Sequence, residues 1–287
     1  MNDYALPIGF ALFCWWFGTG LVFLIERGLR GRPAGAMLGV MAGLAALAVY
    51  GIVQSSQVLL PGRVYLGFAS SIVLWGALEL SFLTGLITGP QVTVCTPVCA
   101  PACRGWRHFG HAVLALIYHE LALAFCTLAV ATLCWDQPNP CAAWTFGLLW
   151  VMREGAKLNL FLGVRNPATE LLPQRLAHLA RYFGKRQMNP LLPLCILGAG
   201  LGEIWLVRQW VGAAATRADR VAGLLLATLL ALAIVEYLVL VLPVRADALW
   251  TWATRRKGRL DPPGGAAPAR AEAGNPTIGL GGAAAAP

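Results

Sequence analysis

Seven uninterrupted apolar stretches of about twenty residues dominate this 287-residue sequence. A hydrocarbon core about 30 Å thick is crossed by roughly 20 helical residues. The stretches lack the strict two-residue alternation of membrane β-strands. We therefore predict an all-α fold, a polytopic transmembrane helical bundle of about seven spans. The predicted spans are residues 6–25, 34–53, 64–88, 111–133, 142–164, 190–207 and 221–242.

The composition agrees with a membrane protein and excludes an ordinary soluble globule. Hydrophobic residues make up 58% of the chain and charged residues only 12%, whereas about a quarter of the residues in a soluble domain are charged. The chain has 22 Lys and Arg against 13 Asp and Glu. These cations lie mainly between the apolar stretches, so membrane topology explains them better than binding to nucleic acid does.

The distribution of cations predicts the orientation. The loops after the first, third and fifth spans and the C-terminal tail together hold 16 Lys and Arg, whereas the opposite side holds 4. The positive-inside rule therefore places the N-terminus outside and the C-terminus in the cytoplasm.

Three regions follow from these patterns. Residues 1–243 form the predicted transmembrane domain, and residues 244–260 form a basic interfacial segment in which Trp250 and Trp252 precede four cations. Residues 261–287 are rich in Ala, Gly and Pro, so we expect a disordered tail.

The cytoplasmic loop of residues 165–189 has apolar residues at helical spacing and cations on its other faces. This pattern is typical of a basic helix on an anionic membrane surface, and a docking surface for a partner is the alternative. The cations assigned to this lipid or partner surface are Arg175, Arg181, Lys185 and Arg186.

Two groups of cysteines lie in loops. Cys134 and Cys141 bracket a short external loop with two prolines and could form a disulfide in an oxidising compartment. Cys95, Cys99 and Cys103 form the pattern CTPVCAPAC, whose spacing differs from the C-x2-C pairs of structural zinc sites, so we predict no metal there.

Polar residues inside the spans are the main candidates for a functional site. An ionised side chain at a helix centre costs about 2.5 to 3.5 kcal/mol on insertion scales, so these residues should face one another or a wet cavity. At 1.5 Å per residue they lie roughly 10 to 20 Å from the cytoplasmic ends of their spans, which predicts one shared layer. The predicted buried polar network or ligand-binding site consists of Glu79, His119, Glu120, Arg153, Glu154, Lys157, Asn159, Glu203 and Glu236.

Helical spacing predicts some of the pairs in this layer. Glu154 and Lys157 are three residues apart and can pair, and Glu120 is a candidate partner from another helix. Five carboxylates face only two fixed cations, which predicts either protonated carboxylates or a missing cation. Such a network could alternatively serve only to fix helix packing.

Two other functions are alternatives for these residues. His108 and His111 at the entrance of the fourth span, or His119 within it, could ligate a metal or the magnesium of a chlorin. A metal-dependent membrane enzyme is therefore one alternative, although the paired Glu-x-x-His motifs of di-metal bundles are missing. A small-molecule transporter is another, although we find no paired broken helices.

Three charged motifs carry a family resemblance: IYHELAL at residues 117–123, REGAKLNLFLGVRN at residues 153–166 and LAHLARYFGKRQMNPLLP at residues 176–193. With them, the chain from about Phe10 to Pro243 resembles the PuhE-type photosynthetic complex assembly proteins.

The resemblance implies a non-catalytic assembly factor in the bacterial inner, or intracytoplasmic, membrane. Its implied partners are membrane lipids, reaction-centre or light-harvesting subunits and bacteriochlorophyll-synthesis enzymes. The implied ligand is bacteriochlorophyll or a precursor, which the polar layer would bind or hand over. The resemblance brings no catalytic residues with it.

Overall fold

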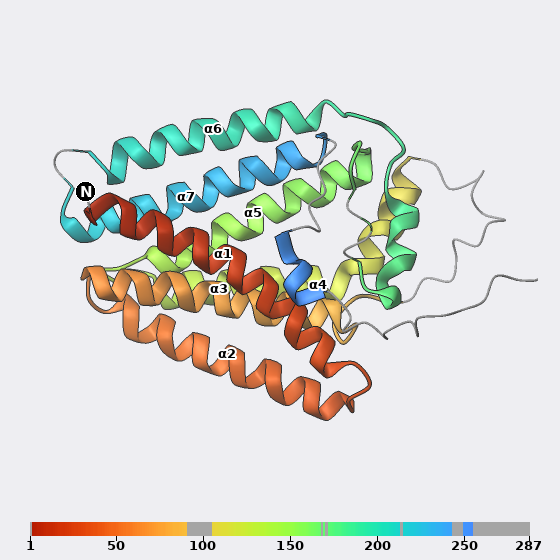
Figure 1. Ribbon diagram of the computed structural model, residues 1–287, viewed down its shortest axis with the longest axis horizontal. Coiled ribbons are helices and arrows are strands. Elements are labelled where there is room, and N and C mark those ends of the chain that lie inside the picture. Colours follow the sequence, from red (N-terminus) through yellow and green to blue (C-terminus); the bar gives the residue numbers. More distant parts are fainter. Residues whose placement is uncertain are drawn as a thin grey trace, which may run out of the picture. The chain divides into compact units, whose positions relative to one another are not determined.

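The computed structural model describes residues 2–90, 105–167, 169, 172–212, 215–242 and 249–254, and these residues form helices and connecting turns without a strand. Seven of the helices are long, and Figure 1 shows α1, α5, α6 and α7 running alongside one another. The long helices are α1 (Asn2–Leu29), α2 (Ala34–Ser56), α3 (Pro61–Leu83), α4 (Trp106–Leu133), α5 (Cys141–Leu162), α6 (Leu191–Trp210) and α7 (Arg217–Val239). Two short helices complete the set, the 3-10 helix η3 (Gln174–Tyr182) and α8 (Thr251–Thr254).

The predicted helical bundle is confirmed. Six of the described helices are long and apolar enough to cross a membrane, namely α1, α2, α3, α4, α6 and α7. The other long helix, α5, has 22 residues but carries Arg153, Glu154 and Lys157. The orientation relative to the membrane stays a prediction.

Helix α3 is the centre of the bundle, because it contacts α1, α2, α4, α5 and α7. Small residues allow its close approach to α2: a Cβ atom on Gly51 would lie 2.1 Å from Ser70 Oγ, and one on Gly67 would lie 2.9 Å from Ser55 Oγ. The Ser71 hydroxyl donates to the Ala142 carbonyl at 2.9 Å and joins α3 to α5. Other helices therefore surround the part of α3 that contains Glu79.

Helix α3 ends at Leu83 rather than at Thr88, where the sequence predicted its end. The chain reverses at Gly85, whose φ of +75° is the left-handed conformation that favours glycine. The following segment lies against α4, where the Thr88 carbonyl accepts the N–H groups of Tyr118 and His119 at 3.0 and 3.1 Å. The Thr88 carbonyl thus fixes this segment against the middle of α4.

The basic loop differs from the predicted surface helix. It forms η3, which Figure 1 shows beside the yellow N-terminal part of α4. Leu176, Leu179 and Tyr182 are buried against Phe82 of α3 and Ala115 of α4. The apolar face therefore packs on the bundle instead of on lipid, and only the basic face stays outside.

Two glycines and an asparagine join this loop to the bundle. Gly163 has a φ of +106° at the end of α5, and a Cβ atom there would lie 2.6 Å from the Arg186 nitrogen. A Cβ atom on Gly184 would lie 2.6 Å from the Gly163 nitrogen. The Asn189 side chain donates to the Gly163 carbonyl at 2.9 Å and accepts from the N–H groups of Leu191 and Leu192, so it caps α6.

Cys134 and Cys141 are free thiols in this structure, and the disulfide between them in an oxidising compartment stays a prediction. Both are buried, and Cys141 Sγ lies 3.9 Å from Thr145 Oγ1. Asn139 holds the loop without a covalent link, because its side chain donates to the Ser55 carbonyl at 2.9 Å and its backbone N–H donates to the Ser56 carbonyl at 3.0 Å.

The predicted interfacial segment is only partly described. Trp250 is 7% exposed and its indole donates to the Trp16 carbonyl at 3.1 Å, so it packs on α1 rather than standing at a membrane surface. A Cβ atom on Gly20 would lie 2.0 Å from the Trp252 ring, which takes the place of a side chain on α1. Three further predictions concern residues outside the described part of the chain: the tail of residues 261–287, the cations of residues 255–259 and the cysteines of residues 95–103.

The backbone at Gly163 generates a stability prediction. Gly163→Ala forces a side chain into a left-handed conformation and against the Arg186 backbone, so we expect a loss of about 1–3 kcal/mol in the free energy of unfolding. Gly39→Ala in α2 is the control, because the space around that position is open. Thermal unfolding in detergent followed by tryptophan fluorescence would contradict this account if both variants unfolded at the wild-type temperature.

Candidate functional site

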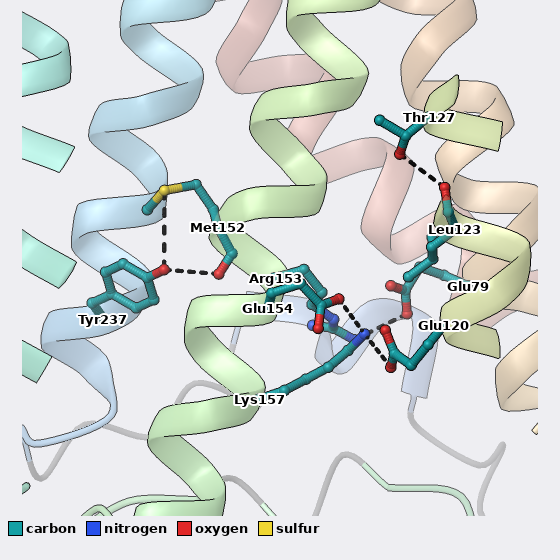
Figure 2. A network of polar contacts seen from close by, with 9 residues as sticks. All are labelled: Glu79, Glu120, Leu123, Thr127, Met152, Arg153, Glu154, Lys157 and Tyr237. Atoms are coloured by element: carbon teal, nitrogen blue, oxygen red, sulfur yellow. Dashed lines mark hydrogen bonds and ion pairs between the residues drawn. The ribbon is translucent and has the colours of Figure 1, made fainter. Parts of the chain in front are cut away.

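Lys157 of α5 lies between two carboxylates. Its Nζ donates to Glu120 Oε1 of α4 at 2.7 Å and to Glu154 Oε1, one helical turn away, at 2.9 Å (Figure 2). The structure therefore contains both pairs that the sequence predicted for Lys157. One cation joins α5 to α4 and neutralises part of the charge of the two acids.

Arg153, one turn before Lys157, pairs with α3. Its Nη2 donates to Glu79 Oε2 at 2.9 Å (Figure 2). Glu79, Glu236, Glu154 and Glu120 all interact electrostatically with Arg153. These carboxylates offset the repulsion expected between two cations four residues apart on one helix.

Glu236 brings α7 and α1 to the same region. Its Oε1 accepts the Trp15 indole N–H at 3.0 Å, and it interacts electrostatically with Arg153 and Glu79. We call the set of Glu79, Glu120, Arg153, Glu154, Lys157 and Glu236 the polar layer.

His119 lies beside this layer but forms no ion pair in the described part of the chain. It is 1% exposed, and its ring stacks on Phe82 with a centroid distance of 4.6 Å. Its Nδ1 is buried without a hydrogen-bond partner, and so is Oε1 of Glu79. Buried polar atoms are usually paired, so two unpaired ones at one site require an explanation such as a water or a ligand.

Besides His119, two predicted members lie outside the layer. Glu203 of α6 has no ion pair or hydrogen bond among the described residues, and its Oε2 is buried and unpaired. Asn159 is fully buried, but its side chain donates to the Gly155 carbonyl at 2.8 Å and to Cys195 Sγ at 3.5 Å. Asn159 therefore joins α5 to α6, and the prediction that polar groups of all the charged spans meet in one layer is too broad.

The polar layer is acidic and partly open. It contains four carboxylates and two cations, which leaves an excess of negative charge when all are ionised. The exposed fraction of the side chain is 43% for Arg153, 35% for Glu154 and about 20% for Lys157 and Glu120. Because an exposed guanidinium is costly in a hydrocarbon environment, the open side needs a polar neighbour.

The histidines at the entrance of α4 lie apart from the layer. The His108 ring packs on Phe161 and Tyr182 with centroid distances of 5.5 and 5.6 Å, and His111 is half-buried. In the part of the chain that the structure describes, no group of three or more His, Cys, Asp and Glu side chains could hold a metal ion.

All four cations assigned to the lipid or partner surface, Arg175, Arg181, Lys185 and Arg186, are exposed. Arg175 differs from the other three, because its guanidinium donates to the Thr84 carbonyl at the end of α3. Arg175 is thus tied to the bundle, and the other three remain as the candidate lipid or partner surface.

Three residues near the layer were not predicted from the sequence. Trp15 donates to Glu236, Thr88 holds the His119 backbone, and the Tyr237 hydroxyl donates to the Met152 carbonyl at 2.8 Å (Figure 2). A Cβ atom on Gly155 would lie 2.2 Å from that hydroxyl, so the glycine in REGAKLN makes room for Tyr237. The only feature of the sequence that pointed to these residues is that Tyr237 follows Glu236. Aromatic residues are too common in membrane helices for this position to predict a contact.

Lys157 provides a test of how much the layer stabilises the bundle. Lys157→Met leaves Glu120 and Glu154 close together without their shared cation, so we expect a loss of about 3 kcal/mol or more in the free energy of unfolding. Arg217→Met is the matched control, because it breaks the ion pair with Asp3, in which the side chains are 74% and 55% exposed. Such exposed pairs contribute less than about 1 kcal/mol. Equal losses in detergent unfolding would show that the layer has no special role in stability.

Comparison with known proteins identifies the family. The family model described as "Protein of unknown function (DUF3623)" matches residues 1–260. A relative from Rhodobacter capsulatus, described as an uncharacterized 30.4 kDa protein in the puhA 5′ region, is 36% identical over 257 residues, which cover 88% of this chain and 91% of the relative. No solved structure matches the chain. The chain therefore belongs to the DUF3623 family.

Proposed function

We propose that this chain is a PuhE-type assembly factor of the bacterial inner membrane that supports photosynthetic reaction-centre or light-harvesting complexes. The resemblance of its three charged motifs to that group supports the proposal, and so does a relative whose gene lies in the 5′ region of puhA. In this role the chain contacts membrane lipids, photosynthetic subunits and enzymes of bacteriochlorophyll synthesis, and it performs no catalysis.

The observation that carries the proposal is the partly open polar layer. Its ion pairs join α3, α4 and α5, yet it keeps surplus carboxylates, an exposed Arg153 and unpaired buried atoms on Glu79 and His119. A network that served packing alone would gain from complete pairing and closure. The incomplete pairing supports a layer that receives a group from outside the chain.

We propose bacteriochlorophyll or a precursor as that group. Arg153 has the charge and the exposure to pair with an acidic substituent of the pigment. His119 has an unpaired ring nitrogen of the kind that ligates magnesium in chlorins, but it is 1% exposed. Pigment binding through His119 therefore requires Phe82 or the Thr88 segment to move, whereas contact with Arg153 requires no such change.

Purification in a mild detergent from a phototrophic host tests pigment binding. We expect chlorin absorption bands to accompany the wild-type protein and to fall at least several-fold in Arg153→Gln, because the variant loses the charge that faces an acidic substituent. Arg217→Gln, which removes an exposed cation distant in sequence, should keep the bands. Bands of equal strength in all three proteins, or none in any, would refute pigment binding at the layer. A metal in stoichiometric amount would instead favour the enzyme.

A second test addresses the assembly role. Glu154→Gln weakens the hold on Lys157, so we expect it to lower the yield of photosynthetic complexes in cells more than a control does. Glu26 is another carboxylate near the end of a long helix, α1, but it is an unsuitable control. It is 3% exposed and accepts hydrogen bonds of 2.8 to 3.1 Å from Arg30. Asp3→Asn, at an exposed carboxylate, is the appropriate comparison. Membrane absorption spectra at equal protein abundance measure the yield, and an equal effect of both variants would count against the layer.

A further inference from the structure

A second polar site lies apart from the polar layer, where η3 packs against the turn that follows α3. It is a cavity of about 220 Å³ lined by Thr84, Gly85, Thr88, Arg175, Leu176 and His178. The turn is fixed by the left-handed Gly85 and by the Thr84 hydroxyl, which donates to the Leu80 carbonyl at 2.8 Å. The cavity is thus framed by segments that the fold holds in place.

The cavity lining favours an anion. Arg175 uses one N–H group to bind the Thr84 carbonyl, and a guanidinium carries five, so further donors remain for a ligand. The Thr88 hydroxyl has only a long contact of 3.4 Å to the Gly89 carbonyl. His178 adds a second basic group, whose Nδ1 lies 3.0 Å from the Arg175 carbonyl. Among the residues that the structure describes, the lining includes neither Asp nor Glu.

Size and position narrow the choice of anion. Sites for drug-sized ligands have about 300–1,000 Å³, so this cavity suits a small head group rather than a pigment macrocycle. It lies at the end of the apolar helix α3, and the exposed cations Arg181, Lys185 and Arg186 belong to the same basic loop. Basic pockets beside transmembrane helices bind the head groups of anionic lipids, and an arginine fork fits phosphate oxygens.

We propose that this cavity binds a phosphate group, with Arg175 as the main ligand, the Thr88 hydroxyl as an additional donor and His178 as a donor when both of its ring nitrogens carry protons. The phosphate belongs to the head group of an anionic phospholipid, whose acyl chains can lie along the apolar helices; free inorganic phosphate is the other source of the same chemistry. The site is separate from the proposed pigment contact at Arg153 and does not depend on it.

Thermal unfolding of the delipidated full-length protein in neutral detergent tests this site. Phosphatidylglycerol at saturation should raise the Tm by about 4 °C or more, and phosphatidylcholine with the same acyl chains should raise it less. Arg175→Gln should lose at least half of the rise. Arg165→Gln should keep it, because it removes an equal charge from an exposed side chain of the same loop that lies outside the candidate lipid surface. An equal loss in the two variants would overturn the site in favour of diffuse attraction.

Two further measurements separate the lipid from free phosphate and a lost site from a misfolded variant. Inorganic phosphate alone is added in a parallel experiment: a rise equal to that with phosphatidylglycerol assigns the site to free phosphate, whereas no rise with either compound refutes phosphate binding. Arg175 also caps α3, so Arg175→Gln is first checked for folding by size-exclusion chromatography. If it does not fold, His178→Ala replaces it, since among the described residues that ring has one hydrogen bond, at 3.0 Å to the Arg175 carbonyl.

Discussion

The two-sided contact of Lys157 with Glu120 and Glu154 is the interaction on which the arrangement of the membrane helices depends. A charged group in a hydrocarbon environment is tolerated when an opposite charge lies against it. At 2.7 and 2.9 Å, both acids are within hydrogen-bond distance of one ammonium group. With Arg153 bound to Glu79 one turn away, α5 can occupy only the position in which α3 and α4 meet these two cations. Apolar contacts alone would allow the helices to slide or rotate, because lipid tails are as apolar as leucine.

The charged motif of α5 contains two kinds of residue. In REGAKLNLFLGVRN, Arg153, Glu154 and Lys157 form ion pairs, whereas Gly155, Asn159 and Gly163 allow or make close contacts with other segments. Asn166 belongs to the second kind, since its backbone N–H donates to the Leu240 carbonyl at 2.8 Å. The motif therefore combines the polar layer with the joints that position it, and a variant in it can fail for either reason.

The sequence predicted the helical bundle and the pairing of Lys157, because both depend on local patterns: continuous apolar stretches and spacing along one helix. It did not predict which helices are neighbours. Glu203 has the same character as Glu79 in the sequence, yet only Glu79 meets a cation, since α3 is central and α6 contacts mainly α7. The apolar residues of η3 likewise have the spacing of a membrane-surface helix, and only the position of Phe82 and Ala115 shows that they cover protein.

The hydrogen bonds that hold the loop between Cys134 and Cys141 could not be predicted for a similar reason. Two cysteines close in sequence satisfy the length of a bridge, but the Asn139 side chain and backbone already hold the loop against α2. Long-range hydrogen bonds of this kind, 84 residues apart for Asn139 and Ser55, leave no periodic signal in the sequence. The partners Trp15 and Thr88 escaped prediction because each acts on a residue far away along the chain.

Thr88 has a consequence for how the two ends of this region communicate. Thr88 lines the cavity, and its carbonyl oxygen accepts the backbone N–H of His119. A single residue thus separates a surface recess from a histidine sealed within the helices. A displacement of the Thr88 backbone breaks the hydrogen bond to the His119 amide. A change in the cavity that moves Thr88 is therefore transmitted to the buried histidine.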